Sequence, residues 1–169
     1  MKRIDEVTTA FSNPAAQLLV GEGNPDDLFF LKRALSSCRL LERATFAANS
    51  ADLTAYLQAA IQPGNPNPPR LPKAILLDPA LPLLFSLKLL EWLHAEPVLR
   101  QIPVVIFTDT DDPRIRSQAS RLGAFLFSIK DPDVTVWPDT LRQIARAVDL
   151  LPAHNDPDLH SYGWLQQAA

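Results

Sequence analysis

Four apolar runs in this sequence each end in a polar residue, and the types of these residues suit phosphoryl transfer to a carboxylate. They are Glu22, Asp78, Thr108 and Lys130. A carboxylate can attack a phosphoryl group, a lysine ammonium can neutralise the oxygens of the acyl phosphate, and a threonine hydroxyl can donate a hydrogen bond to one of them. Asp78, Lys130 and Thr108 therefore fit one reaction, provided that the fold brings them together.

The elements that must position these residues are short apolar runs, which alternate with longer amphipathic stretches. Strands are predicted at residues 17–20, 44–48, 74–77, 103–107 and 125–129. This alternation is typical of a parallel sheet with crossover helices, whose ligands bind beyond the carboxyl ends of the strands. The predicted fold class is α/β, a doubly wound five-stranded parallel sheet flanked by about five helices.

The helix after the first strand has a clear start. Asn24 is the expected cap, Pro25 occupies the first helical position, and Asp26 and Asp27 lie in the first turn. Capping and interaction with the helix dipole account for both aspartates, so we assign them no further role. Later helices are predicted after a Ser50 cap, over residues 85–94, from Pro113 to Gly123, and around Leu141, Ile144 and Val148.

Length and composition indicate one globular domain. The chain has 169 residues, of which 47% are hydrophobic, and a net charge of −3, so it lacks the basic excess that direct nucleic-acid binding requires. Cys38 is the only cysteine, which excludes an internal disulfide and fits a reducing compartment. No apolar run approaches the length of a membrane span. We therefore predict a cytoplasmic protein without a membrane segment.

The predicted organisation is an N-terminal arm at residues 1–15, a domain at 16–150 and a C-terminal extension at 151–169. The proline-rich stretch 62–72 is expected to be an exposed loop. The extension carries Tyr162 and Trp164, large aromatics that either fold back onto the domain or meet a partner chain. We therefore expect it to be helical and interface-forming. His154 and His160 match no metal cluster and are expected on the surface.

Over residues 16–150 the chain resembles the receiver domain of bacterial response regulators, of the stand-alone chemotaxis-receiver type. The resemblance rests on segments 18–27, 75–82, 103–108 and 123–130, which occur in the family's order with helix-length spacing. The Asn-Pro-Asp-Asp helix start and the tail segment Tyr-Gly-Trp-Leu are also similar to small response regulators that partner phytochrome-type kinases.

The resemblance implies a flavodoxin-like fold with strand order 2-1-3-4-5 and a function in phosphorelay signalling. Asp78 would accept a phosphoryl group from a sensor histidine kinase, Lys130 would contact that group, and Thr108 would move toward it. Phe127 matches the aromatic residue whose rotation reports phosphorylation. The metal site implied for Mg²⁺ is made of Glu22, Asp78 and the backbone carbonyl of Ala80. Such a protein is no metabolic enzyme; at most it catalyses its own phosphorylation and dephosphorylation.

Gly23 departs from the family pattern at the second acidic position, which ligates magnesium directly in the family. Because Mg²⁺ prefers several hard oxygen ligands, we expect weak Mg²⁺ binding or none. Asp26 and Asp27 lie near enough in the sequence to substitute for the missing ligand, but their role at the helix start explains them, so we do not expect such a rescue.

Other departures concern the surroundings of the phosphoryl group. Asp109 follows Thr108 where the family has a small residue, so its charge either repels the phosphoryl group or supplements the metal site. Asp131 follows Lys130 where the family has a proline, and Pro132 comes one residue later. Ser86 replaces a glycine common at the start of the third helix, a change of local turn only.

Three functions are compatible with these features. The first is a single-domain response regulator that signals by protein contact, with a homodimer expected through the last helix and the extension. The second, motivated by Gly23, Asp109 and Asp131, is a degenerate receiver that acts as a phosphorylation-independent adaptor. The third is a flavodoxin-like domain for a small ligand, which the missing glycine-rich phosphate loop disfavours.

Overall fold

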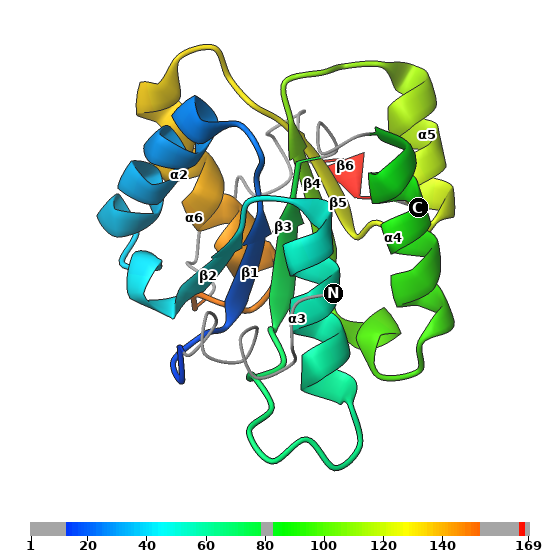
Figure 1. Cartoon of the computed structure of the whole chain (residues 1–169). Helices are drawn as coiled ribbons and strands as arrows, with labels where there is room; N and C mark the ends of the chain where they lie inside the picture. The colour runs from blue at the N-terminus through cyan, green and yellow to red at the C-terminus, as the bar shows by residue number, and fades with distance from the viewer. Residues whose placement is uncertain (1–12, 79–82, 153–165, 168–169) are drawn as a thin grey trace.

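The computed structural model describes residues 13–78, 83–152 and 166–167 and contains a six-stranded sheet of order β2-β1-β3-β4-β5-β6 (Figure 1). The strands are β1 Leu18–Gly21, β2 Ala44–Ala47, β3 Ala74–Leu77, β4 Val104–Thr108, β5 Leu126–Ile129 and β6 Gln166–Gln167. The first five pair in parallel, so the predicted parallel sheet of order 2-1-3-4-5 is confirmed. The sixth was not predicted and runs antiparallel to β5.

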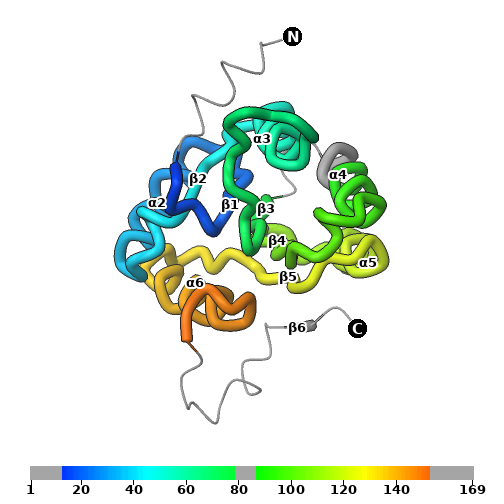
Figure 2. The backbone as a smooth tube through the Cα atoms, turned by 90° about the horizontal axis from the view of Figure 1, so that it is seen from below, coloured from blue at the N-terminus to red at the C-terminus, as the bar shows by residue number. Residues whose placement is uncertain are grey.

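Helices cover both faces of the sheet. The helices are α2 Pro25–Ser37, α3 Ser50–Ile61, α4 Leu83–Ala95, α5 Pro113–Arg121 and α6 Trp137–Ala147. Three short 3₁₀ turns, Leu41–Arg43, Leu99–Gln101 and Val134–Val136, join them to the strands. Figure 2, which looks along the strands, shows α2 and α6 on one face and α3, α4 and α5 on the other.

The core is divided by the sheet into two apolar layers. Along β3, Leu76 packs with Leu35 of α2 and Leu141 of α6, whereas Ile75 packs with Leu57 of α3 on the other face. All four residues of β3 are buried, which is typical of a central parallel strand covered on both sides. The sheet thus lies between two layers of helices. Because β1 to β5 run parallel, their carboxyl ends form one edge of the sheet.

Helix boundaries follow local signals. Asn24 caps α2 as predicted, but the prediction of Ser50 as the cap of α3 is wrong. Asn49 is the cap, since its side-chain oxygen accepts the N–H of Asp52 at 2.8 Å. Gly123 ends α5 as predicted: the N–H of Gly123 and that of Ala124 bond back into the helix, and Gly123 has φ +86°.

The proline-rich segment 62–72 is mostly exposed and is anchored from α3. The Tyr56 hydroxyl donates to the carbonyl of Arg70 at 2.6 Å, and the Asn65 amide donates to the carbonyl of Ala59 at 2.9 Å. Among the residues described, no helix is long and apolar enough to span a bilayer.

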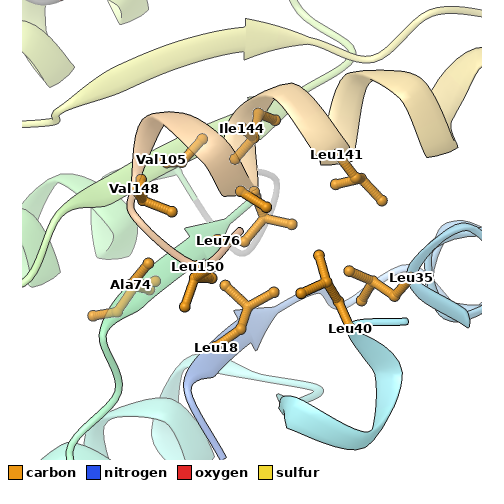
Figure 3. Close-up of a pocket in the computed structure, with 12 residues that line it drawn as sticks. Leu18, Leu35, Leu40, Ala74, Leu76, Val105, Leu141, Ile144, Val148 and Leu150 are labelled. Carbon is orange, nitrogen blue, oxygen red and sulfur yellow. The ribbon is translucent and has the colours of Figure 1, made fainter. Parts of the chain in front are cut away.

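An apolar pocket lies between the sheet and helices α2 and α6 (Figure 3). Leu18 and Ala74 begin their strands at one end of it, and Leu141 and Val148 of the α6 segment line its other wall. All its lining side chains are apolar, so it offers no group to orient a polar ligand. We regard it as loose packing at the end of the sheet away from Asp78.

Most of the two terminal segments lies outside the described residues. This holds for Tyr162, Trp164, His154 and His160, and for residues 1–12 of the N-terminal arm. Of the extension, Gln166 and Gln167 are described as a strand rather than a helix. Ser86 lies within α4.

Candidate functional site

The four polar residues gather at the carboxyl edge of the sheet. Glu22 follows β1, Asp78 follows β3, Thr108 is the last residue of β4, and Lys130 follows β5. Each is buried, with 1–5% of its surface exposed. Buried charged residues are rare unless they are paired, so their shared burial points to direct contacts.

The ammonium of Lys130 is the centre of these contacts. Its Nζ lies 2.5 Å from Oδ2 of Asp78, 2.7 Å from Oε2 of Glu22 and 2.6 Å from Oδ2 of Asp27. Such short distances are those of charge-assisted hydrogen bonds. Beneath the ammonium, the rings of Phe107 and Trp137 have their centres 5.8 and 5.9 Å from Nζ. The lysine is therefore held between aromatic rings and carboxylates.

The backbone explains why these side chains converge. Each site residue extends the hydrogen-bonding of the sheet by one step: Glu22 N–H donates to Ala47 O at 3.1 Å, Asp78 N–H to Gly21 O at 2.9 Å, and Lys130 N–H to Thr108 O at 2.6 Å. Positions fixed in this way are more rigid than positions on a free loop.

Asp27 belongs to this cluster, although its place in the sequence predicted only a role at the helix start. The interpretation that both aspartates serve only the start of α2 holds for Asp26, which is exposed and has no contact with Lys130 among the described hydrogen bonds, but it is wrong for Asp27. Two features of the sequence could have pointed to Asp27. Asn24 already provides the cap, and α2 begins at the same edge of the sheet at which Lys130 follows β5.

Burial and ion pairing shift two pKa values in the cluster. Burial raises the pKa of Glu22, although hydrogen bonds from Lys130 and from the N–H of Asn24 oppose this. Burial lowers the pKa of Lys130, but the hydrogen bonds to Asp27, Asp78 and Glu22 outweigh it, so the pKa lies above its ordinary value. Lys130 therefore stays protonated at neutral pH, and burial favours the protonated form of Glu22.

The three carboxylates also suit a divalent cation. Glu22, Asp27 and Asp78 each offer one oxygen, and these oxygens lie within 4.8 Å of one another. Hard oxygen ligands of this kind are those that Mg²⁺ prefers, so the residues fit the ion that the receiver resemblance implies. A metal ion would have to share these oxygens with Lys130. Ala80, the expected source of a backbone carbonyl, lies outside the described residues, and Gly23 is exposed.

Thr108 is buried, whereas the residue that follows it, Asp109, is exposed. The Thr108 hydroxyl oxygen accepts the N–H of Thr110 at 3.3 Å, which shapes the loop after β4. Asp109 is exposed and is not among the three clustered carboxylates of the described residues. The alternative in which Asp109 supplements the metal site therefore has no support in this geometry.

Phe127 is buried with 4% of its surface exposed, on the α5 side of β5. The guanidinium of Arg116 lies over its ring, 5.0 Å from the centre, and Arg116 also pairs with Asp111 at 2.5 Å. The aromatic ring thus contacts a helix whose cation is bound to the loop that follows Thr108.

The turn after Lys130 is fixed without a proline directly after the lysine. The Trp137 indole N–H donates to the carbonyl of Asp131 at 2.8 Å, and the Asp131 side chain accepts the N–H of Asp133 at 2.8 Å. Within the described ranges no peptide bond is cis. The departure at Asp131 therefore does not prevent Lys130 from pointing into the site.

Comparison with known proteins gives structural neighbours only. No protein-family model matches the chain, and no curated protein matches it significantly. Among solved structures, the phosphorylated cyanobacterial phytochrome response regulator RcpA has a TM-score of 0.69 at 20% identity, covering 82% of this chain and 97% of that one.

Two further neighbours have related descriptions. The bacteriophytochrome response regulator AtBRR has a TM-score of 0.61 at 26% identity, over 82% of this chain and 96% of its own. The Mn²⁺-bound form of response regulator Rcp1 has a TM-score of 0.67 at 22% identity, over 83% and 97%. The sheet order and these likenesses define a doubly wound, flavodoxin-like α/β domain. Within this class, the fold is that of response regulator receiver domains, and the structural neighbours with this fold include phytochrome response regulators.

Proposed function

We propose that the chain is a two-component response regulator whose single receiver domain accepts a phosphoryl group on Asp78 from a sensor histidine kinase. One observation carries the proposal. At the carboxyl edge of a receiver fold, the buried carboxylate of Asp78 lies 2.5 Å from the buried ammonium of Lys130. That the structural neighbours are response regulators supports the same class of function.

In the proposed reaction an oxygen of Asp78 attacks the phosphorus of a phosphohistidine. The O–P bond forms, the P–N bond breaks, and the imidazole leaves with its electron pair. Lys130 stays protonated and neutralises charge on the transferred phosphoryl oxygens. The Thr108 hydroxyl oxygen accepts the N–H of Thr110, so that bond does not use the hydroxyl proton. In the proposed reaction this proton turns toward the phosphoryl group. A bound Mg²⁺ would add charge neutralisation, held by Glu22, Asp27 and Asp78.

Phosphorylation by a small donor tests the proposal. Incubation of the full chain with acetyl phosphate and Mg²⁺ should add the mass of one phosphoryl group to the wild type and none to Asp78→Asn. Asp26→Asn is the matched control, because Asp26 is an exposed carboxylate beside the same site. A wild type that stays unmodified, or an adduct that survives Asp78→Asn, would contradict the assignment of Asp78.

A second candidate function is that of a phosphorylation-independent adaptor. The observation in its favour is that Lys130 already forms ion pairs with Asp78, Glu22 and Asp27, while Gly23 provides no carboxylate. An adaptor should bind its partner equally well as wild type and as Asp78→Asn, in the presence and absence of acetyl phosphate. Tighter or weaker binding upon phosphorylation of the wild type alone would exclude this reading.

The proposal extends to partners and location. We propose a cytoplasmic homodimer that forms through α6 and the extension, with a phytochrome-type kinase upstream. Two features support an interface near the extension: β6 pairs antiparallel with the outer strand β5, and the sequence of the extension contains Tyr162 and Trp164. Sedimentation of the full chain should show dimers that dissociate when residues 153–169 are removed. A monomeric full chain at high concentration would contradict the dimer.

A further inference from the structure

Trp137 is a buried aromatic residue that contacts the candidate site from the first position of α6. Only 3% of its surface is exposed. Its indole N–H donates to the carbonyl of Asp131 at 2.8 Å, and its ring centre lies 5.9 Å from Nζ of Lys130. One side chain therefore contacts both the lysine of the site and the residue that follows this lysine.

The backbone on the two sides of the Lys130 side chain is held in two different ways. Before it, the sheet provides the contact, because the N–H of Lys130 donates to the carbonyl of Thr108 at 2.6 Å. After it, the chain leaves the sheet, and the side chain of Asp131 accepts only a local N–H, that of Asp133. Among the described hydrogen bonds, the one from Trp137 is therefore the bond that ties Asp131 to another element of the fold.

The ring of Trp137 also forms part of an aromatic surface next to the ammonium. It packs edge to face on Phe107, with ring centres 5.4 Å apart and an angle of 77° between the rings. The Phe107 ring centre lies 5.8 Å from Nζ of Lys130. Both rings are thus within the distance of about 6 Å over which an aromatic face attracts a cation.

Phosphoryl transfer makes the direction of the Lys130 side chain important. The ammonium has to reach the phosphoryl oxygens on Asp78, and a misplacement of about 1 Å can slow a reaction about a hundredfold. Lysine carries a point charge on a flexible chain, so carboxylates attract the ammonium without fixing the path of that chain. A rigid neighbour can fix it, and Trp137 is rigid because it is buried and hydrogen-bonded.

We propose that Trp137 is a positioning residue of the candidate site. Its indole N–H holds the turn after Lys130, and its ring supports the side chain that presents the ammonium to Asp78. The inference rests on the proposed function, because the reaction that this positioning serves is the phosphorylation of Asp78. A residue that only fills the core would contribute to stability and to neither of these contacts.

Lysine reactivity provides a test that needs neither metal nor phosphorylation. The full chain is acetylated under native conditions, and peptide mass spectrometry compares Lys130 with the exposed Lys88 of the same molecule. Trp137→Phe keeps an aromatic ring but loses the N–H, so it should raise the relative acetylation rate of Lys130 several-fold. The matched control is Trp92→Phe, because Trp92 is half-buried in the apolar layer on the other face of the sheet, and it should leave that rate unchanged.

The rate of phosphorylation provides the second test. With acetyl phosphate and Mg²⁺, intact mass measured over time gives the rate at which Asp78 gains a phosphoryl group. Trp137→Phe should lower this rate about tenfold, because the ammonium is no longer held in its productive position. Trp92→Phe should leave the rate as it is in the wild type.

A second variant covers the case in which Trp137→Phe does not fold, which thermal unfolding reveals. Benzothienylalanine at position 137 keeps the two fused rings and replaces the indole N–H by sulfur. It therefore removes the bond to the Asp131 carbonyl with little change in shape. It should give the same increase in acetylation and the same decrease in phosphorylation.

The outcomes separate the inference from the proposed function. If the wild type is phosphorylated and loss of the indole N–H changes neither rate, Trp137 only fills the core, and the inference is refuted while the proposed function stands. A change at Lys130 without slower phosphorylation also refutes the inference. If the wild type takes no phosphoryl group, the proposed function fails, and the acetylation rate still decides whether Trp137 holds Lys130.

Discussion

Lys130 is the residue on which the candidate site depends, because its charge balances three carboxylates in a small volume. A buried ion pair contributes little to net stability when it is intact, but loss of one partner leaves uncompensated buried charge. The cluster therefore has a large effect on stability only when it is broken. This asymmetry makes its members accessible to measurement by single substitutions.

Replacement of Lys130 by methionine should lower the free energy of unfolding by about 3–5 kcal/mol at neutral pH, because Glu22 and Asp78 lose their cation while buried. The deficit should shrink as the pH falls, since Glu22, whose pKa is raised by burial, needs no cation once it is protonated. Urea unfolding at two pH values measures both effects, with Lys88→Met on the exposed side of α4 as control. An equal deficit at both pH values would show that the loss is one of packing alone.

Glu22 should give a pH dependence of its own. Its folded-state pKa is raised by burial, so the folded protein binds the Glu22 proton more tightly than the unfolded chain does. The stability that the Glu22 proton contributes is fully present when the pH is below the pKa of Glu22 in the unfolded chain, about 4.3. It is lost as the pH rises through the folded-state pKa. Relative to Glu22→Gln, the wild type should therefore lose stability over that range. The exposed Glu91→Gln should show no such trend, and a trend of opposite sign would refute the raised pKa.

At the scale of single elements, start and stop signals explain most of the fold. Apolar runs predicted every strand of the parallel sheet, and Asn24 and Gly123 marked helix ends correctly. The end of β1 was missed because Gly21 belongs to the strand only through its pairing with Ala47 and Leu77, which no local pattern shows. Similarly, β6 consists of two glutamines without an apolar pattern, and the residues of β5 with which it pairs, Leu126 and Phe127, are far away in the sequence.

The candidate site was predictable to the same extent as the strands that carry it. Glu22, Asp78 and Lys130 were found because each follows an apolar run, and position in a parallel sheet implies proximity. Asp27 was not found, because a carboxylate in the first turn of a helix has a sufficient local explanation. Its contact with Lys130 depends on how α2 is placed against β5, which is a property of the packed molecule.

Gly123 offers a test of why α5 ends where it does. Alanine there must adopt φ +86°, and its Cβ would lie 2.9 Å from Nδ1 of His94. Gly64→Ala is the matched control, with φ +76° and no atom within 4 Å of the added Cβ. We expect a loss of about 1 kcal/mol for Gly64→Ala from the backbone alone, and more for Gly123→Ala. Chemical unfolding measures both, and addition of His94→Ala should remove only the excess at Gly123.

On the scale of the whole molecule, one sheet joins two cores. Ile75 and Leu76 are neighbours on β3, yet they belong to different apolar layers. A strand shared in this way couples the α2 and α6 layer to the layer of α3, α4 and α5. We expect the two layers to unfold as one unit.

Ile75→Ala and Leu76→Ala should each lower the free energy of unfolding by about 2–5 kcal/mol, since both side chains are fully enclosed. Because Leu76 lines the apolar pocket of Figure 3, its removal enlarges a space that already exists. Both variants should keep the wild-type dependence of unfolding on denaturant concentration, and fluorescence and circular dichroism should report the same midpoint. Separate midpoints for one variant would show that the layers unfold independently.

The short strand β6 has a consequence for solubility. A parallel sheet of this order has two outer strands, and unpaired N–H and C=O groups on an outer strand invite pairing with another molecule. Gln166 and Gln167 pair with Phe127 and Leu126, so part of the outer edge of β5 is already occupied by the chain itself. This occupation comes from the backbone of a strand of only two residues. The pairing of β6 with β5 therefore leaves fewer free backbone groups for edge-to-edge aggregation with another molecule.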